Sequence, residues 1–427
     1  MGIKNLHSFL KNTCPNIYKK KHLSEYCQQK ITVDVSIYLC KYKSVYGTKW
    51  LEAIFKLICI MRKYNIHLFF IYDAKAPPEK DKVRLQRKEA REKNKQRIDR
   101  IEEIWNEHLK KVCNQDEDIE TKIFFPQHFD YDILMERFIK RCSIQCNNDS
   151  GLKKQEIQKE IERLHNTVIS ISLQDILLTK ELCKLCKIPF MTAYGEAEAT
   201  CSSLDRQNYV EGVLTEDTDV LAYGANKMLF RLDILEETLL EINIQDIYRE
   251  LELNPLEFLD FCILCGTDYN SNIHRVGTET SFKLIKKWRT LEKIQVECAH
   301  LPVSDLNYKR VRELFLTFLS FHSIDIPFCG IPHFPSLFEF GFSNNISIPS
   351  QDEIKDIFIH SCFSFIDKQE KCSFSSCHVE DEQKKETTNS SLPSLLSLPS
   401  NQVEQQNNHL KNTNKTLLLL HSKLSCM

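Results

Sequence analysis

The sequence predicts an α/β fold in which a central, mostly parallel sheet is flanked by helices. Residues 31–35 and 67–73 have the β-branched and aromatic composition of buried strands. Residues 50–62, which lie between them, carry apolar side chains at helical spacing. A strand, helix, strand order of this length favours a parallel pair of strands joined by a right-handed crossover.

The other elements follow in order along the chain. Residues 76–78 break the second strand, and we expect a long charged helix over 79–111 and a polar, irregular insertion over 113–168. Further helices are expected over 173–186, from 195 onward, over 254–268 and over 278–288, with strands at 189–191 and 212–214. Residues 387–416 are mostly Ser, Asn, Gln, Thr and Pro, so we expect disorder, because such a segment buries too little apolar surface to offset chain entropy.

The composition narrows the class of protein. The 57 Lys and Arg residues nearly balance the 59 Asp and Glu residues, which gives a formal net charge of −2. This balance excludes a polycationic DNA-coating protein and an acidic, mostly disordered chain. The 18 cysteines are scattered through apolar segments, which is typical of buried thiols in a reducing compartment. No secretory signal and no run of about 18 apolar residues is present, so we expect an intracellular protein with no membrane span.

Acidic side chains occupy the positions where the predicted strands end. In an open parallel sheet these ends meet in one crevice, so we expect the acids to converge there. The set consists of Asp34, Asp73, Glu196, Glu198, Asp217, Asp219 and Asp268. Any one of them alone is compatible with an ordinary helix cap, but seven carboxylates in one crevice would repel strongly without cations. Oxygen ligands without His or Cys suit two Mg²⁺ ions, with Mn²⁺ as a substitute, and such a pair supports phosphoryl displacement.

The sequence spacing within two pairs of these acids indicates whether their side chains can face one ion. Asp217 and Asp219 are two residues apart, so both point to one face if the segment is extended. Glu196 and Glu198 are about 200° apart on a helix, so spacing alone does not aim both at one ion. We expect them at a first turn, with one in direct contact and the other acting through water.

A basic segment follows Asp73. Residues 75–100 contain 11 Lys and Arg residues against 5 Asp and Glu residues, a local net charge of +6. One helical stripe is formed by Lys80, Arg84, Arg87, Arg91 and Lys95. A solvated charged helix is the simpler interpretation of such a stripe. Beside an acidic crevice, we favour the interpretation that Lys80 and Arg87 bind one phosphate.

Five blocks along the chain together resemble the flap endonuclease family, the 5′-nucleases of XPG/Rad2 type, and most of all its divergent poxvirus branch. The blocks are residues 1–3 (MGI), 73–78 (DAKAPP), 195–199 (GEAEA), 215–219 (TEDTD) and 264–269 (LCGTDY). The resemblance covers roughly residues 1–100 and 170–320. It implies a PIN-like nuclease domain over 1–250 and a helix–two-turn–helix module over 251–330 that grips duplex DNA. A divergent extension over 331–366 and a low-complexity tail over 367–427 have no counterpart in the family.

The resemblance also implies roles for individual residues. The seven acids would surround two divalent ions, with Asp73 as a catalytic residue, and Lys80 and Arg87 would polarise the scissile phosphate. The residues expected to contact DNA are Gly2, Tyr38, Arg84, Arg91, Arg275 and Gly277. Among these, Gly2 lies near the site once Met1 is removed, Tyr38 corresponds to an aromatic that stacks on a base, and Arg275 replaces a family glycine.

We therefore expect a Mg²⁺-dependent structure-specific endonuclease that cuts 5′ flaps or junctions in branched DNA. It would act in replication, recombination and double-strand-break repair of a viral genome, in the host cytoplasm if the poxvirus resemblance holds, with viral replication proteins as candidate partners. No sliding-clamp-binding motif is visible in the tail. Two alternatives stay open: a catalytically weak DNA-binding scaffold of a replication assembly, and an RNA-cutting nuclease on the same fold.

Overall fold

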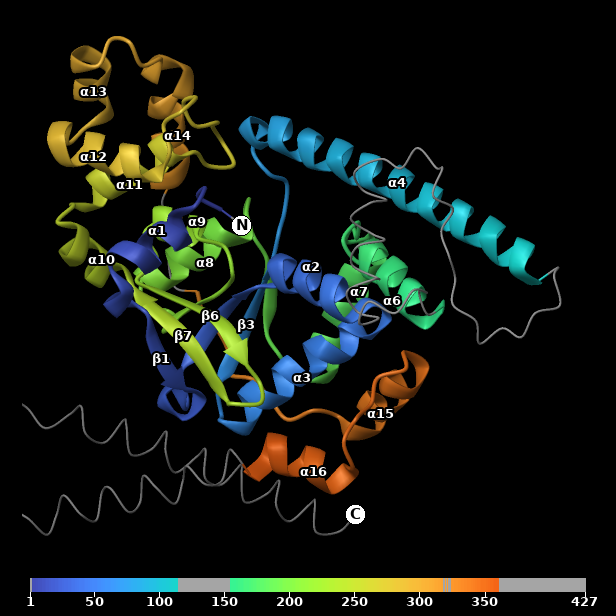
Figure 1. Ribbon diagram of the computed structural model, residues 1–427. Helices are drawn as coiled ribbons and strands as arrows, with labels where there is room; N and C mark the ends of the chain where they lie inside the picture. Colours follow the sequence, from blue (N-terminus) through green and yellow to red (C-terminus); the bar gives the residue numbers. More distant parts are fainter. Residues whose placement is uncertain (1, 114–153, 318, 320, 322–323, 361–427) are drawn as a thin grey trace, which may run out of the picture. The chain divides into compact units, whose positions relative to one another are not determined.

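A seven-stranded sheet runs through the part of the chain that the computed structural model describes, which is residues 2–113, 154–317, 319, 321 and 324–360 (Figure 1). The strands are β1 (Lys19–His22), β2 (Lys30–Asp34), β3 (His67–Tyr72), β4 (Phe190–Thr192), β5 (Gly212–Leu214), β6 (Lys227–Asp233) and β7 (Thr238–Asn243). Their order is β1-β7-β6-β5-β2-β3-β4. The run from β6 to β4 is parallel, and β7 pairs antiparallel with β6 and β1. The expected mostly parallel sheet is confirmed.

Strands β2 to β5 lie where the sequence placed strands, whereas β1, β6 and β7 were not expected. Residues of β1 read Lys, Lys, Lys, His and are largely exposed, so this edge strand has no alternation of apolar and polar residues. Its place is fixed by backbone pairing with β7. A polar edge strand of this kind is recognisable only once its neighbour is known.

Two apolar clusters cover the two faces of the sheet. In β3, Phe69 and Ile71 belong to one cluster, while Leu68 and Phe70 belong to the other. This alternation follows from the two-residue period of a strand, and it explains why the central strands are apolar on both faces. The sheet is therefore the middle layer of three, and only its ends are free to hold polar groups.

Helices supply the outer layers (Figure 1). They are α1 (Leu6–Thr13), α2 (Val35–Tyr46), α3 (Trp50–Lys63), α4 (Asp81–Cys113), α6 (Lys154–His165), α7 (Leu173–Leu185), α8 (Ala197–Arg206), α9 (Asp219–Ala222), α10 (Ile244–Leu251), α11 (Pro255–Cys265), α12 (Thr278–Trp288), α13 (Leu291–Glu297), α14 (Tyr308–Leu316), α15 (Phe334–Ser343) and α16 (Gln351–Lys355). Side chains of α2, α3, α7, α15 and α16 belong to one of the two apolar clusters, and those of α1, α8 and α9 to α14 belong to the other. Among the described residues, none of these helices is both long and apolar enough to span a membrane.

The expected insertion over 113–168 is only partly irregular. Residues 114–153 lie outside the described chain, but α6 is helical, so the expectation is wrong for this part. The reason is a buried contact: Ile161 is buried, as are Ile98, Ile101 and Trp105 of α4, and α6 packs against that helix. The expected low-complexity tail over 367–427 also lies outside the described residues.

The region expected as a separate DNA-binding module shares its core with the sheet domain. Phe9 of α1 lies 5.2 Å, between ring centroids, from both Phe261 of α11 and Phe282 of α12. The backbone N–H of Lys4 donates to the carbonyl oxygen of Gly266 at 3.1 Å. The N-terminus therefore holds this helical pair in place. Residues of the expected extension are also packed, since Leu337 of α15 belongs to the cluster around α3 and α7.

Helix α11 ends at Cys265 rather than at Asp268 as expected, and Gly266 is the cause. Its φ of 98° lies in the region that favours glycine, and a Cβ there would lie 3.0 Å from the backbone nitrogen of Asn272. The chain then turns, and the turn is held by hydrogen bonds from Asn270 Nδ2 to Ile263 O (2.8 Å) and from Thr267 Oγ1 to Asn270 Oδ1 (2.8 Å). Asp268 is presented from this turn.

We expect the substitution Gly266→Ala to lower the free energy of unfolding by about 2 kcal/mol, because it adds a Cβ at positive φ and crowds Asn272. Urea denaturation measures the loss. The matched control is Gly277→Ala in the same module, where φ is −89° and nothing lies within 4 Å of an added Cβ. This control should change stability by less than about 1 kcal/mol, and equal losses in the two variants would contradict the explanation.

Candidate active site

The acidic residues meet at one edge of the sheet because the strands that carry them are parallel neighbours. Strands β5, β2, β3 and β4 are adjacent, so their carboxyl ends lie together. Asp34 ends β2, and Asp73 follows β3 directly. The other expected acids follow β4, β5 or α11 and reach the same place. Six of the seven are between 2 and 9% exposed, namely Asp219, Asp34, Asp217, Asp268, Glu196 and Glu198.

Asp73 is the exception, because it is exposed. Its Oδ1 accepts a hydrogen bond of 2.8 Å from the backbone N–H of Ala197, the first residue of α8. The residue before that helix, Glu196, makes no side-chain cap of its own. Asp73 therefore caps α8 from a distant part of the chain and fixes where Glu196 and Glu198 begin.

A tight turn positions the acids after β5. The hydroxyl of Thr215 donates to Asp34 Oδ2 (3.2 Å) and accepts from the backbone N–H of Asp217 (3.1 Å). The backbone N–H of Asp219 donates to Asp217 Oδ1 at 3.0 Å, and α9 starts at Asp219. Residues 215–219 therefore form a turn that leads into α9, and they are not extended as the two-residue spacing of the acids suggests. Both acids still face the cluster, because the turn folds Asp217 back toward the start of α9.

Burial and mutual repulsion raise the pKa of several of these carboxyl groups. Burial, with Asp73 and Asp217 nearby, raises the pKa of Asp34 to about 8. Burial also raises the pKa of Asp217. The pKa of Glu198 and that of Asp219 lie well above the ordinary value, again through burial first and neighbouring carboxylates second. Each proton bound here reduces the repulsion that a cation would otherwise remove.

The donor set fits a hard divalent cation. Asp34 Oδ1 and Asp219 Oδ1 are buried and have no hydrogen-bond partner. Such oxygens are unfavourable unless a cation or a donor reaches them, and carboxylates alone are the ligands that Mg²⁺ and Mn²⁺ prefer. Within the described residues, however, no three acidic, His or Cys side chains are grouped closely enough to hold an ion as they stand. A lysine ammonium lies among the acids instead.

That ammonium belongs to Lys80, which lies in a short 3₁₀ turn (Pro78–Lys80) just before α4. Its Nζ pairs with Glu196, lies 3.3 Å from Asp268 Oδ2 and lies 4.0 Å from Glu198 Oε1. Burial opposes the charge of Lys80, but Glu198 and Glu196 outweigh it and raise the pKa of the ammonium above its ordinary value. The acids therefore hold this lysine charged.

Arg87 reaches the same cluster from the second turn of α4. Its NH2 lies 2.6 Å from Asp268 Oδ1, and its side chain is 45% exposed. The structure thus brings Lys80 and Arg87 to the acids, as the sequence predicts. It does not bring the rest of the stripe there: Arg84 is exposed and pairs with Asp81 at 3.3 Å, and Arg91 is exposed.

Gly2 lies against the acidic cluster, as expected. Its φ is 87°, and a Cβ there would overlap Asp217 Oδ1 and lie 2.7 Å from Thr218 Oγ1. Only glycine allows the backbone this close to the turn after β5. Gly2 thus adjoins the acidic cluster, while its expected contact with DNA stays a prediction.

Tyr38 is not available to stack on a base, and this expectation is wrong for the structure described. The side chain is only 1% exposed and belongs to the apolar cluster around α2 and α3. Since α2 begins directly after Asp34, a residue four positions later faces inward with the buried side of the helix. The exposed aromatic on this helix is Tyr46.

In the hairpin between α11 and α12, the backbone of Arg275 adopts a left-handed conformation that usually favours glycine. Its φ is 64°, so an arginine occupies a left-handed position, while its side chain is exposed. Gly277 precedes the first turn of α12 and has open space around it. Both residues lie on the surface, on the same short loop.

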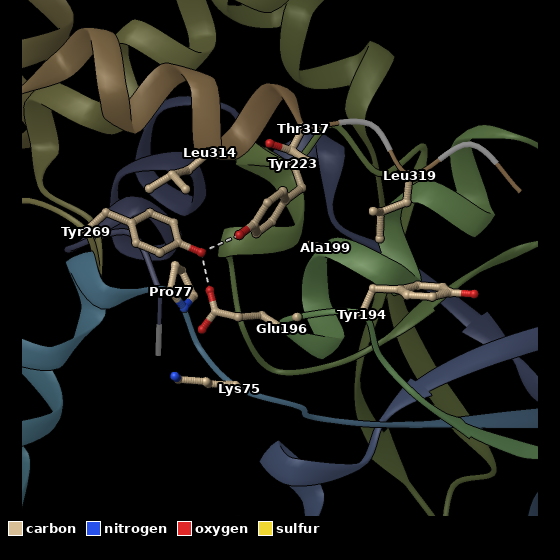
Figure 2. Close-up of a pocket in the computed structure, with 11 residues that line it drawn as sticks. Lys75, Pro77, Tyr194, Glu196, Ala199, Tyr223, Tyr269, Leu314, Thr317 and Leu319 are labelled. Atoms are coloured by element: carbon tan, nitrogen blue, oxygen red, sulfur yellow. Dashed lines mark hydrogen bonds between the residues drawn. The ribbon is translucent and has the colours of Figure 1, made fainter.

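Two tyrosines that were given no role complete the site. The hydroxyl of Tyr269 donates to Glu196 Oε2, and it also forms a hydrogen bond with the hydroxyl of Tyr223 (Figure 2). Glu196 is therefore held on one oxygen by Lys80 and on the other by Tyr269. The position of Tyr269 directly after Asp268, within one of the five sequence blocks, was the available signal.

Comparison with known proteins agrees with this arrangement. The chain matches the family models "XPG N-terminal domain" over residues 1–94 and "XPG I-region" over residues 187–268. It is 32% identical over 339 residues to the probable RAD2-like endonuclease 369L of Invertebrate iridescent virus 6, a match that covers 74% of this chain and 79% of that protein. It is 33% identical over 335 residues to the probable RAD2-like endonuclease 076L of Invertebrate iridescent virus 3, covering 74% and 85%. These viral relatives come from iridescent viruses, which corrects the expected poxvirus affinity.

More distant similarities point the same way. Flap endonuclease 1 of Ostreococcus lucimarinus is 24% identical over 335 residues, covering 74% of this chain and 73% of that protein. Among solved structures, the catalytic core of Rad2 in complex with DNA substrate superimposes with a TM-score of 0.54 at 16% identity, covering 83% and 99% of the two chains. The flap endonuclease-1 from Methanococcus jannaschii gives 0.51 at 15% identity, covering 86% and 100%. At these identities the superpositions establish the fold.

We expect the metal-free protein to become less stable as the pH rises, in part because of Asp34. The folded-state pKa of about 8 exceeds the unfolded value of about 4, so the folded state binds the proton more tightly. The stabilisation is fully present below about pH 4 and is lost as the pH rises toward 8. Thermal denaturation in EDTA between pH 5 and pH 8 measures this loss.

The variant Asp34→Asn should show a smaller fall in Tm over the same range, because it carries no charge at either pH. The exposed acid Asp305 provides the control, and Asp305→Asn should follow the wild-type curve. Parallel curves for wild type and Asp34→Asn would show that Asp34 is not the source of the effect.

Proposed function

Since the chain belongs to the XPG family of RAD2-like nucleases, we propose that it is a divalent-metal-dependent, structure-specific endonuclease that cuts 5′ flaps or junctions in branched DNA. The observation that carries the proposal is the convergence of six buried carboxylates with Lys80 and Arg87 at one sheet edge. Such a set serves phosphodiester hydrolysis and has no comparable use as a structural core. Relatives described as RAD2-like endonucleases and flap endonucleases support the choice of substrate.

The acids are proposed to bind the metal. Asp219 and Asp34 are the least exposed candidates, and Asp73, Glu196, Glu198, Asp217 and Asp268 complete the set. Divalent ions bound there, with Mg²⁺ as the expected species and two per site, would activate water and stabilise charge on the phosphoryl oxygens. Asp73 has a second role in the protein itself, because it caps the helix that presents Glu196 and Glu198.

Lys80 and Arg87 are proposed to bind the scissile phosphate. Both are cations already held at the acids, so neither must be drawn from solvent when the substrate arrives. A preorganised cation stabilises developing negative charge without reorganisation at the moment of reaction. Arg87 is half-exposed and offers a planar guanidinium to a phosphate that approaches from the side of α4.

Surface residues away from the acids are proposed to hold the rest of the DNA. Arg84 and Arg91 lie on the exposed side of α4, where they would pair with phosphates along one strand. The loop before α12 offers Arg275 and the open backbone at Gly277, beside the N-terminus of an 11-residue helix. Backbone amides at such a terminus bind phosphate without reading sequence, which suits recognition of DNA shape.

The viral relatives support a place in the replication, recombination and double-strand-break repair of a viral genome. The protein would then work in a reducing intracellular compartment, such as the cytoplasm of an infected cell, beside other viral replication proteins. Unpairing the substrate near buried ligands costs a few kcal/mol, so frayed and branched ends are favoured over intact duplex.

We expect the purified protein to cut labelled 5′-flap DNA in Mg²⁺, and to cut duplex, single-stranded and RNA substrates more slowly. The variants Asp34→Asn and Lys80→Ala should each lower the single-turnover rate by about a hundredfold or more, since each removes a group that acts on the reacting phosphate. Gel electrophoresis of labelled products measures the rates.

The matched control is Glu236→Ala, which removes an exposed acid in the turn between β6 and β7 and should cut at the wild-type rate. Tight binding of flap DNA without Mg²⁺-dependent cleavage would favour the scaffold alternative. Preferential cleavage of RNA flaps would favour the RNA nuclease.

The variant Gly2→Ala should fold but cut flap DNA at least about tenfold more slowly, because its Cβ overlaps Asp217 and displaces a proposed metal ligand. Gly47→Ala is the matched control: this glycine also has a positive φ of 54°, but its neighbour is Asn166 and not a site residue. Both variants should lose about 1 kcal/mol of stability, measured by urea denaturation. Equal activity in the two variants would contradict the placement of Gly2 at the site.

A further inference from the structure

A pocket of about 260 Å³ adjoins the acidic cluster (Figure 2). It lies between the loops that follow β3 and β4, the start of α8 and the end of α14. Its walls are mainly apolar and aromatic, and they include Pro77, Tyr194, Ala199, Leu314 and Leu319. No part of the proposed hydrolysis uses this space.

The pocket shares one residue with the proposed metal site. Glu196 lines the pocket, and so do Tyr269 and Tyr223, which are linked to it by hydrogen bonds (Figure 2). The second oxygen of the Glu196 carboxylate pairs with Lys80. A group in the pocket is therefore separated from the acids by one carboxylate, so it lies next to the phosphate that the acids and Lys80 would hold.

The lining has the character of a site for one flat, partly apolar group. Tyr194 lines the pocket and is 75% exposed, and its ring points outward, away from Glu196, Tyr223 and Tyr269 (Figure 2). Such an exposed ring beside apolar walls offers a stacking surface at little entropic cost. The volume falls below the roughly 300–1,000 Å³ of sites for drug-sized ligands, which suits a single aromatic base.

Besides the Glu196 carboxylate and the tyrosine hydroxyls, the pocket has two polar side chains in its lining, Lys75 and Thr317. The hydroxyl of Thr317 donates to Glu313 O at 2.9 Å, so its oxygen is left to accept a hydrogen bond from a base edge. Lys75 lies at the rim and carries the charge that a sugar-phosphate backbone would meet. The carboxylate of Glu196 disfavours an anion inside the pocket, so phosphate itself is a poor occupant.

We propose that this pocket receives the unpaired nucleobase of a nucleotide that flanks the scissile phosphate, with Tyr194 stacking on its face. The inference rests on the proposed nuclease function and adds a base-binding subsite to it. A base can enter only when it has left the duplex, so the pocket favours ends that are already frayed or branched. Because stacking accepts every base, the subsite reads the unpaired state and not the sequence.

The test compares flap DNA with flap DNA that lacks one base, on either side of the scissile phosphate, so that the two abasic substrates probe both positions. Binding is measured in EDTA by fluorescence anisotropy at low salt, and single-turnover cleavage is measured separately in Mg²⁺. The proteins are wild type, Tyr194→Ala, Tyr194→Phe and Thr317→Trp, which fills the pocket from its rim. Phe342→Ala, which removes a 90% exposed aromatic on α15, is the matched control.

We expect wild type to bind the complete flap about tenfold more tightly than one of the two abasic flaps, a size typical of stacking on one aromatic ring. Tyr194→Ala and Thr317→Trp should lose this difference while binding the abasic flap as wild type does. Tyr194→Phe and Phe342→Ala should keep it, because the ring or the whole pocket is preserved.

Equal binding of complete and abasic flaps by wild type, or an unchanged difference in Tyr194→Ala, would overturn the base pocket even if the protein cuts flaps well. An apolar peptide from a partner protein as the true occupant would produce this same result. Failure of wild type to bind or cut any branched DNA would instead overturn the nuclease proposal, and the base pocket with it.

Discussion

Repulsion among buried carboxylates is the constraint on which the rest of the site depends. The parallel order of β5, β2, β3 and β4 brings their carboxyl ends together, and the residues at those ends are acids. Without cations, such a cluster opposes folding through both desolvation and mutual repulsion, which is why the pKa of Asp34 rises to about 8. Lys80 offsets part of this by lying among three of the acids. The protein thus carries a site that is costly to its own stability, as functional sites commonly are.

The surrounding backbone is shaped to hold these charges in place. Gly2 lets the N-terminal segment press against the turn after β5, and Gly266 ends α11 so that Asp268 projects from a turn. One carboxylate oxygen of Asp73 caps α8. This hydrogen bond ties the end of β3 to the start of the helix at which Glu196 and Glu198 lie. The contacts of Gly2 and Asp73 join segments that are far apart in sequence, whereas the turn at Gly266 is local. The acids are therefore positioned by long-range packing and not by any one motif.

The sequence predicts the parts of this architecture that depend on local pattern. Strands β2, β3 and β5 are mostly apolar because both of their faces are buried, and the acids that follow the predicted strands could be assigned to one edge from strand order alone. Edge strand β1 could not be predicted, since its pairing with β7 and not its residues makes it a strand. Tyr38 was misjudged because its orientation depends on where α2 begins. Tertiary contacts divide the basic stripe: Lys80 and Arg87 reach the acidic cluster, whereas Arg84 pairs with Asp81 on its own helix.

Glu196 belongs both to the acidic cluster and to the lining of the pocket beside it. One of its oxygens pairs with Lys80 and the other accepts from Tyr269, so both oxygens are engaged before any cation arrives. A cation that uses this carboxylate must compete with one of the two partners. Tyr269 is also bonded to Tyr223, and both line the base-sized pocket, so a group seated there bears on the same hydrogen bond. A base in the proposed pocket that displaced this hydrogen bond would, by reciprocal linkage, also change the affinity of Glu196 for a divalent cation. The carboxylate of Glu196 is therefore the one side chain through which the proposed metal site and the proposed base pocket would be coupled.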